Sequence, residues 1–164
     1  MSSPKAFLGL VLLVAGLPAR AGERVPPVAS YRIEASWDEE RKVLAGRETI
    51  TFVNRTTRPF DDVVLHLYLN GFRNTRSTLY RALPRPTGSD GFGYCELKRI
   101  APSGGEDLTR RVTFASGGAD NPDDRTLVRV PLTRPVAPGE TLVLEVDFES
   151  RLPRGLLRTG WKDD

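Results

Sequence analysis

The sequence predicts an all-β fold, an antiparallel two-sheet sandwich or saddle of about seven strands, preceded by a signal peptide. Three observations indicate this class. Short segments alternate apolar and polar residues, turn-forming residues separate these segments, and no convincing amphipathic helix interrupts them. Because side chains alternate faces along a strand, each such segment buries one face and leaves the other in water.

The N-terminal segment 1–21 has the features of a cleaved export signal. Lys5 supplies a positive start, Ala6 to Leu17 carry no charge, and Ala19-Arg20-Ala21 matches the small-x-small pattern that a signal peptidase reads. An apolar run of about 12 residues is too short to cross a bilayer as a helix. We therefore expect an exported protein, periplasmic or secreted, with no membrane span after signal cleavage.

Charge and composition exclude several classes of protein. Loss of residues 1–21 removes Lys5 and Arg20 and no acidic residue, so 22 of the 24 basic residues remain against 21 acidic ones, a net charge of +1. The charges are mixed and form no long basic run, which argues against nucleic-acid binding. Cys95 is the single cysteine, so no internal disulfide forms, and we interpret it as a small, partly buried strand residue.

The rest of the chain divides into a leader at 22–29 with two prolines, a β-domain at 30–155 and a terminal segment at 156–164. The strands are expected at residues 31–37, 43–54, 63–69, 95–100, 111–115, 126–131 and 142–148.

Two strand pairs and one central strand are predicted within this domain. The first two strands should form a hairpin, and the first is expected to be half-buried, with Tyr31, Ile33, Ala35 and Trp37 on one face. The last two, within 124–153, should form another hairpin around a wide turn that contains Pro135, Pro138 and Gly139. The segment 63–69 is apolar on both faces, so we expect it to be central or covered by another layer.

Candidate sites are few. His66 is the single histidine and lies in an expected strand, which favours a hydrogen-bonded structural role over a zinc site. Glu39-Glu40 and Asp123-Asp124 are acid pairs in charged loops, where solvation is more common than catalysis. The cluster at 116–125 has no recognised calcium-loop spacing. Asn54-Arg55-Thr56 matches the glycosylation acceptor pattern in a segment that reads as a turn.

A long loop at 70–94 is the segment most typical of a functional role, since long loops inside compact domains usually bind something or pack against a partner. Its Arg73, Arg76 and Arg81 would suit an acidic surface, and a solvated loop is the simpler account. The sequence holds no H-E-x-x-H, no paired Cys/His spacing, no nucleophile elbow and no phosphate loop. We therefore assign no catalytic and no metal-binding residue to this chain, and its binding residues stay open.

Two runs resemble the N-terminal β-domain of the aminopeptidase-N-like zinc metallopeptidases, the gluzincin aminopeptidases. The first is Gly46-Arg-Glu-Thr-Ile-Thr-Phe-Val-Asn54 followed by Val64-Leu-His-Leu-Tyr-Leu-Asn-Gly-Phe72. The second is Leu127-Val-Arg-Val-Pro-Leu-Thr-Arg-Pro-Val-Ala-Pro-Gly-Glu-Thr141, a strand, Pro-Gly turn and strand. The ending Arg158-Thr-Gly-Trp161 looks like the junction before that family's catalytic domain.

This resemblance implies an exported zinc peptidase whose β-domain precedes a thermolysin-like catalytic domain. In the family, the zinc ligands, the general-base glutamate and the substrate-amine motif lie C-terminal to this region, so no catalytic residue carries over and zinc is expected in the missing domain. We expect a fragment or a truncated product, whose partners are its own C-terminal catalytic domain and the peptide substrate. The loop at 70–94 and the tail Leu156 to Trp161 should then be poorly packed on their own.

A second reading is a stand-alone exported β-sandwich that binds a protein or a glycan. An exposed aromatic platform of Phe72, Tyr80, Phe92 and Tyr94 would favour it. A self-contained enzyme is a third reading, for which the sequence offers no ligands.

Overall fold

The chain folds into two antiparallel sheets, as its alternating segments predict. The computed structural model describes residues 27–82, 91–115, 121–154 and 159–162. The predicted signal peptide and most of the leader lie outside these residues. Within the described ranges, no helix is long and apolar enough to cross a bilayer.

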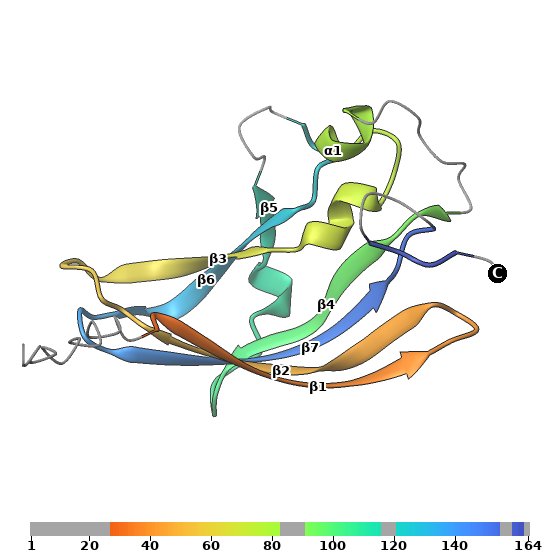
Figure 1. Ribbon diagram of the computed structural model, residues 1–164. Coiled ribbons are helices and arrows are strands. Elements are labelled where there is room, and N and C mark those ends of the chain that lie inside the picture. The colour runs from red at the N-terminus through yellow and green to blue at the C-terminus, as the bar shows by residue number, and fades with distance from the viewer. Residues whose placement is uncertain (1–26, 83–90, 116–120, 155–158, 163–164) are drawn as a thin grey trace, which may run out of the picture.

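The seven described strands divide between a larger and a smaller sheet (Figure 1). The larger sheet has the order β1-β2-β7-β4 and the smaller sheet the order β3-β6-β5. The larger sheet consists of β1 (Ala29–Asp38), β2 (Val43–Val53), β7 (Thr141–Arg151) and β4 (Tyr94–Pro102). The smaller sheet consists of β3 (Phe60–His66), β6 (Leu127–Val136) and β5 (Thr113–Ala115). This confirms the predicted all-β class, and the hairpin of β1 with β2 is also confirmed.

The predicted hairpin at 124–153 is wrong, because β6 and β7 belong to opposite sheets. β6 continues through both of its prolines to Val136, and the turn that follows is tight. Glu140 N–H donates to the Ala137 carbonyl at 3.0 Å, and Gly139 has a φ of 80°. Pro138 and Gly139 thus occupy the central positions of a type II turn, where the second residue needs a positive φ.

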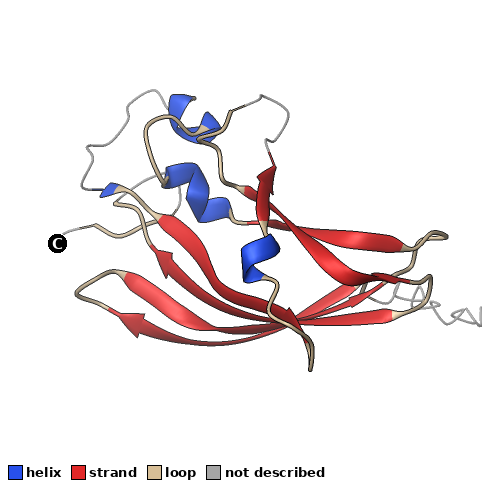
Figure 2. Ribbon diagram, turned by 180° about the vertical axis from the view of Figure 1, so that it is seen from behind, coloured by secondary structure: helices blue, strands red, loops and turns tan. Residues whose placement is uncertain are grey.

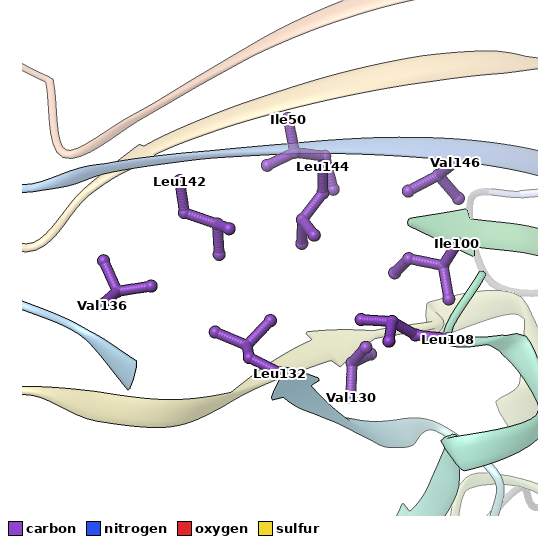
Figure 3. Packing of buried hydrophobic residues seen from close by; sticks show 9 residues of the cluster. All are labelled: Ile50, Ile100, Leu108, Val130, Leu132, Val136, Leu142, Leu144 and Val146. Atoms are coloured by element: carbon purple, nitrogen blue, oxygen red, sulfur yellow. The ribbon is translucent and has the colours of Figure 1, made fainter. Parts of the chain in front are cut away.

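The core forms where β6 and β7 face each other across the interior (Figure 3). Val130 and Leu132 of β6 lie opposite Leu142 and Leu144 of β7, and all four are buried. Each fully buried aliphatic side chain contributes about 1.5–3 kcal/mol. The two strands therefore meet through side chains instead of backbone hydrogen bonds, a distinction that alternation cannot reveal.

The two sheets are close at the β6–β7 turn and diverge toward the turn between β1 and β2, as Figures 1 and 2 show from opposite sides. The predicted burial of β1 is therefore wrong. Tyr31 is 64% exposed and Ile33 56% exposed, and Trp37 is exposed as well. These side chains have the alternation of a half-buried strand, but no layer of the described structure covers them.

The expected central strand at 63–69 is also corrected. β3 lies at the edge of the smaller sheet and ends at His66, and a 3-10 helix, η1 (Tyr68–Phe72), follows it. The buried side chain of Asn70 explains the change of direction. Its Nδ2 donates to the Arg125 carbonyl at 2.9 Å, and its Oδ1 accepts from Cys95 N–H at 2.9 Å. These bonds tie the chain after β3 to two other segments, so the strand cannot continue.

Two further helical turns, α1 (Thr78–Arg81) and η3 (Thr109–Arg111), lie in the connections. Ser77 caps α1, because its Oγ accepts from Tyr80 N–H at 3.1 Å. The charged connection between β1 and β2, with Glu39 and Glu40, is an exposed turn as expected.

Asn54 joins the two sheets at their closed end. Its side chain is fully buried, and Nδ2 donates to the carbonyls of Arg58 and Val136 at 3.0 and 2.9 Å. Its backbone pairs with the β6–β7 turn, where Gly139 N–H donates to the Asn54 carbonyl at 2.7 Å. Both donors of the amide are used inside the protein. The asparagine of the glycosylation pattern therefore has a structural role.

Replacement of this amide should destabilise the whole sandwich. In Asn54→Ala, the buried carbonyl of Val136 and the half-buried carbonyl of Arg58 lose their donor, and Thr56 N–H loses its acceptor. We expect the free energy of unfolding in urea to fall by about 2–4 kcal/mol. Arg55→Ala, at the exposed neighbour, should change it by no more than about 0.5 kcal/mol. Equal effects of the two substitutions would contradict the role of Asn54.

Candidate binding groove

The divergence of the sheets leaves a groove of about 520 Å³ on the inner face of the larger sheet. It lies between the β1 side of that sheet and the chain from β3 into η1, and it continues into a second hollow of about 430 Å³. The two hollows share Tyr31, Ile50, Val64 and Leu65. The exposed apolar side chains of Tyr31, Ile33 and Val64 line this groove.

The strand register explains why the groove is apolar. Tyr31 pairs with Ile50, which pairs with Leu144, so all three side chains project to the same inner face. Across this row the exposed fraction falls from 64% at Tyr31 to 7% at Ile50 and 2% at Leu144. The same hydrophobic face therefore passes from closed core to open groove as it approaches β1.

Glu48 is the charged residue of this inner face. The register places it between Ile33 of β1 and Val146 of β7, and its side chain is half-buried. Burial raises the pKa of the Glu48 carboxyl above its ordinary value. A carboxylate in such surroundings favours an apolar ligand surface that carries one cationic group, since the cation would replace the lost solvation.

Cys95 and His66 both line the groove. Cys95 is half-buried in β4, as expected, and burial raises the pKa of its thiol. A thiol with a raised pKa is a poor nucleophile at neutral pH. His66 is exposed at the end of β3, and its ring centroid lies 3.6 Å from that of Tyr68. The contact that the structure shows for this side chain is therefore a ring contact with Tyr68 at the rim of the groove, not the expected hydrogen bond.

The acidic cluster is occupied by partners from this chain. Arg76 Nε lies 2.7 Å from Asp123 Oδ2, and this guanidinium lowers the pKa of the Asp123 carboxyl. Asp124 is buried and accepts from Thr126 Oγ1 at 2.7 Å. Residues 116–120 of the cluster lie outside the described residues. Among those described, no group of three or more His, Cys, Asp or Glu is placed to hold a metal ion.

The arginines of the 70–94 loop differ in their surroundings. Arg73 Nη2 lies 3.3 Å from Glu96 Oε1, and Arg76 pairs with Asp123, so both face acids of their own chain. Arg81 is exposed on α1. An acidic partner would therefore have to compete with two existing ion pairs.

The described parts of the 70–94 loop contain a small core of their own, so the predicted poor packing is wrong for them. Phe72 and Tyr80 are buried, and the rings of Tyr80 and Phe92 meet edge to face at 5.6 Å. Tyr94 Oη donates to Glu149 at 2.7 Å. These four aromatic side chains therefore do not form the exposed platform that the glycan-binding reading would need.

The described part of the tail also has contacts. Trp161 N–H donates to the Pro153 carbonyl at 3.0 Å, and the Lys42 ammonium lies 5.3 Å from the centroid of the Trp161 ring. The predicted poor packing of the tail is thus wrong for Trp161, and residues 155–158 lie outside the described residues.

Neither Glu48 nor the exposure of Tyr31 is among the features predicted from the sequence. The signal for Glu48 was present, because it lies two residues before Ile50 and therefore shares its face. The exposure of Tyr31 left no such signal. In comparisons with known proteins, no protein-family model and no curated protein matches this chain.

The environment of Glu48 predicts a pH dependence of stability. With a raised pKa in the folded state, the native protein keeps this proton to higher pH than the unfolded chain does. The contribution of Glu48 to stability is therefore fully present below its ordinary pKa and is lost as the pH rises through the raised folded value. Glu48→Gln should be more stable than the wild type at pH 7, and the difference should shrink toward about pH 4.

Urea unfolding of both proteins across this pH range measures the difference. Glu39→Gln, in the exposed β1–β2 turn, is the matched control and should show a smaller pH-dependent difference. A Glu48→Gln variant that is less stable than the wild type at pH 7 would show that the carboxylate has a favourable partner in the groove.

Proposed function

We propose that this chain is the non-catalytic N-terminal β-domain of an exported zinc-dependent aminopeptidase-like metallopeptidase. In this proposal the domain shapes the substrate cleft of a C-terminal catalytic domain, which supplies the zinc and the chemistry. The observation that carries the proposal is the uncovered groove. An apolar hollow of about 520 Å³, rimmed by polar residues, is typical of a surface that another domain or partner covers.

The resemblance at Gly46 to Phe72 and at Leu127 to Thr141 supports a catalytic domain as the cover. Both runs contribute to the groove or its frame, since Glu48, Leu65 and Tyr68 line it and β6 faces it across the core. The titratable groups at its wall, Glu48 and Cys95, have pKa values raised by burial. A thiol with a raised pKa is a poor nucleophile at neutral pH.

The alternative proposal is a stand-alone module that binds a protein surface. The burial of Phe72 and Tyr80 removes the aromatic platform on which glycan binding was expected to depend. Binding of a protein surface in the same groove is the form that the apolar lining favours.

The reading frame beyond codon 164 tests the proposal directly. We expect it to encode an H-E-x-x-H motif with a glutamate further downstream. The extended protein should contain about one zinc ion per chain by elemental analysis and should release the chromophore from aminoacyl anilides in a chelator-sensitive manner. A frame without these ligands, or a full-length protein without zinc and without activity, would refute the proposal.

A groove variant tests the role of the domain in that extended protein. Tyr68 is 75% exposed in this chain and lines the groove, so Tyr68→Asp should change the stability of the 164-residue chain by less than about 1 kcal/mol. If a catalytic domain covers the groove, the same substitution should weaken domain packing in the extended enzyme by about 1–3 kcal/mol, measured by urea unfolding.

Phe114→Asp is the matched control, because Phe114 is an exposed aromatic residue that does not line the groove. It should have similar small effects in both proteins. Equal losses for the two variants in the extended enzyme would mean that the groove is not the covered surface.

A further inference from the structure

The free edge of β1 is long, regular and exposed. β1 is the end strand of the larger sheet, its ten residues pair with β2 without a bulge, and every residue from Ser30 to Trp37 is exposed. Natural sheets usually protect such an edge, because its unpaired N–H and C=O groups can pair with another strand.

The opposite edge strand of the same sheet, β4, is protected. β4 has a register shift between Leu97 and Arg99. Its Cys95 N–H donates to Asn70 Oδ1 at 2.9 Å, and its Ile100 N–H donates to Thr109 Oγ1 at 3.0 Å. No comparable bond to the outer edge of β1 is found among the described residues.

The hydrogen-bond pattern identifies which groups of β1 are free. Val53 N–H donates to the Val28 carbonyl at 2.9 Å, so the backbone of Val28 faces β2. In an antiparallel pair, residues alternate between those that bond to the neighbour and those that do not. Ser30, Arg32, Glu34 and Ser36 therefore bond to β2. The odd-numbered residues of β1, from 29 to 37, direct their N–H and C=O groups away from the sheet.

We propose that two copies of this chain pair through their β1 edges, antiparallel, with Ile33 opposite Ile33 of the second copy. This register brings odd-numbered residues opposite each other, so the free backbone groups of both strands meet. The result is one continuous eight-stranded sheet, and it does not depend on the proposed function.

The side chains of β1 are self-complementary in this register. On the groove face, Tyr31 lies opposite Ala35 of the second copy, and Ala29 lies opposite Trp37 of the second copy, so each large residue meets a small one. On the other face, Arg32, which pairs with Glu34 of its own strand at 2.8 Å, also lies opposite Glu34 of the second copy, so the two-fold axis gathers two arginines and two glutamates into one alternating cluster. Directly opposed opposite charges stabilise antiparallel strands.

Neighbouring registers are disfavoured by the same charges. A shift in one direction places Arg32 opposite Arg32 of the second copy, and a shift in the other places Glu34 opposite Glu34. Like charges directly opposite each other destabilise a strand pair. The exposed sequence Arg32-Ile33-Glu34 therefore favours the pairing centred on Ile33 over the registers on either side of it.

A charge exchange tests both the dimer and its register. Sedimentation velocity of the purified chain should give about twice the mass of one chain, and Arg32→Glu and Glu34→Arg should each raise the dissociation constant at least about tenfold. The double variant Arg32→Glu/Glu34→Arg reverses both charges and should restore the dimer. Arg99→Glu, which breaks an ion pair with Glu145 and lies on β4, the opposite edge of the same sheet, is the matched control and should leave the dimer intact.

Ile33→Pro is an independent test. It removes an outward N–H while leaving the bonds of β1 to β2 in place, so it should give a folded monomer with an unchanged circular dichroism spectrum. A wild-type chain that is monomeric at about 100 µM would overturn the proposal. So would single charge variants that remain dimeric, or a double variant that does not recover.

Discussion

The buried amide of Asn54 connects the two sheets, and much of the architecture depends on that connection. The residue follows β2 of the larger sheet directly, bonds to the last residue of β6 in the smaller one and receives a hydrogen bond from the turn that leads into β7. A buried amide that lost its hydrogen-bond partners would cost free energy. The junction is therefore stable in the arrangement in which both donors of the amide are bonded. It holds the sheets together at one end. At the other end, side-chain packing sets the distance between them.

The groove follows from that one-sided closure. Near the junction, β6 and β7 fill the interior with interlocking aliphatic side chains such as Leu132 and Leu142. The smaller sheet has three strands against four, so it does not extend over β1. The apolar face of the larger sheet consequently extends beyond the smaller sheet that covers it. A partner that buried the exposed part would gain binding free energy from it.

β1 presents two different surfaces to such partners. Its inner face, with Tyr31 and Ile33, belongs to the groove that we assign to a covering domain. Its outer edge offers backbone groups, and the order of Arg32 and Glu34 suits a second copy. The two uses are compatible, because one involves side chains on a face and the other involves the hydrogen-bonding edge.

The sequence alone determined the all-β class and all seven strands, because alternation and turn residues act locally: Leu142 to Phe148 could only be a strand with one apolar face. It also placed Cys95 correctly as a half-buried strand residue. Which strands share a sheet was decided by tertiary structure, since the side chains of β6 and β7 would alternate in the same way in a hairpin or across a sandwich. The exposure of Tyr31 and the buried role of Asn54 were decided in the same way, because burial depends on which layer lies above a residue and that layer comes from distant parts of the chain.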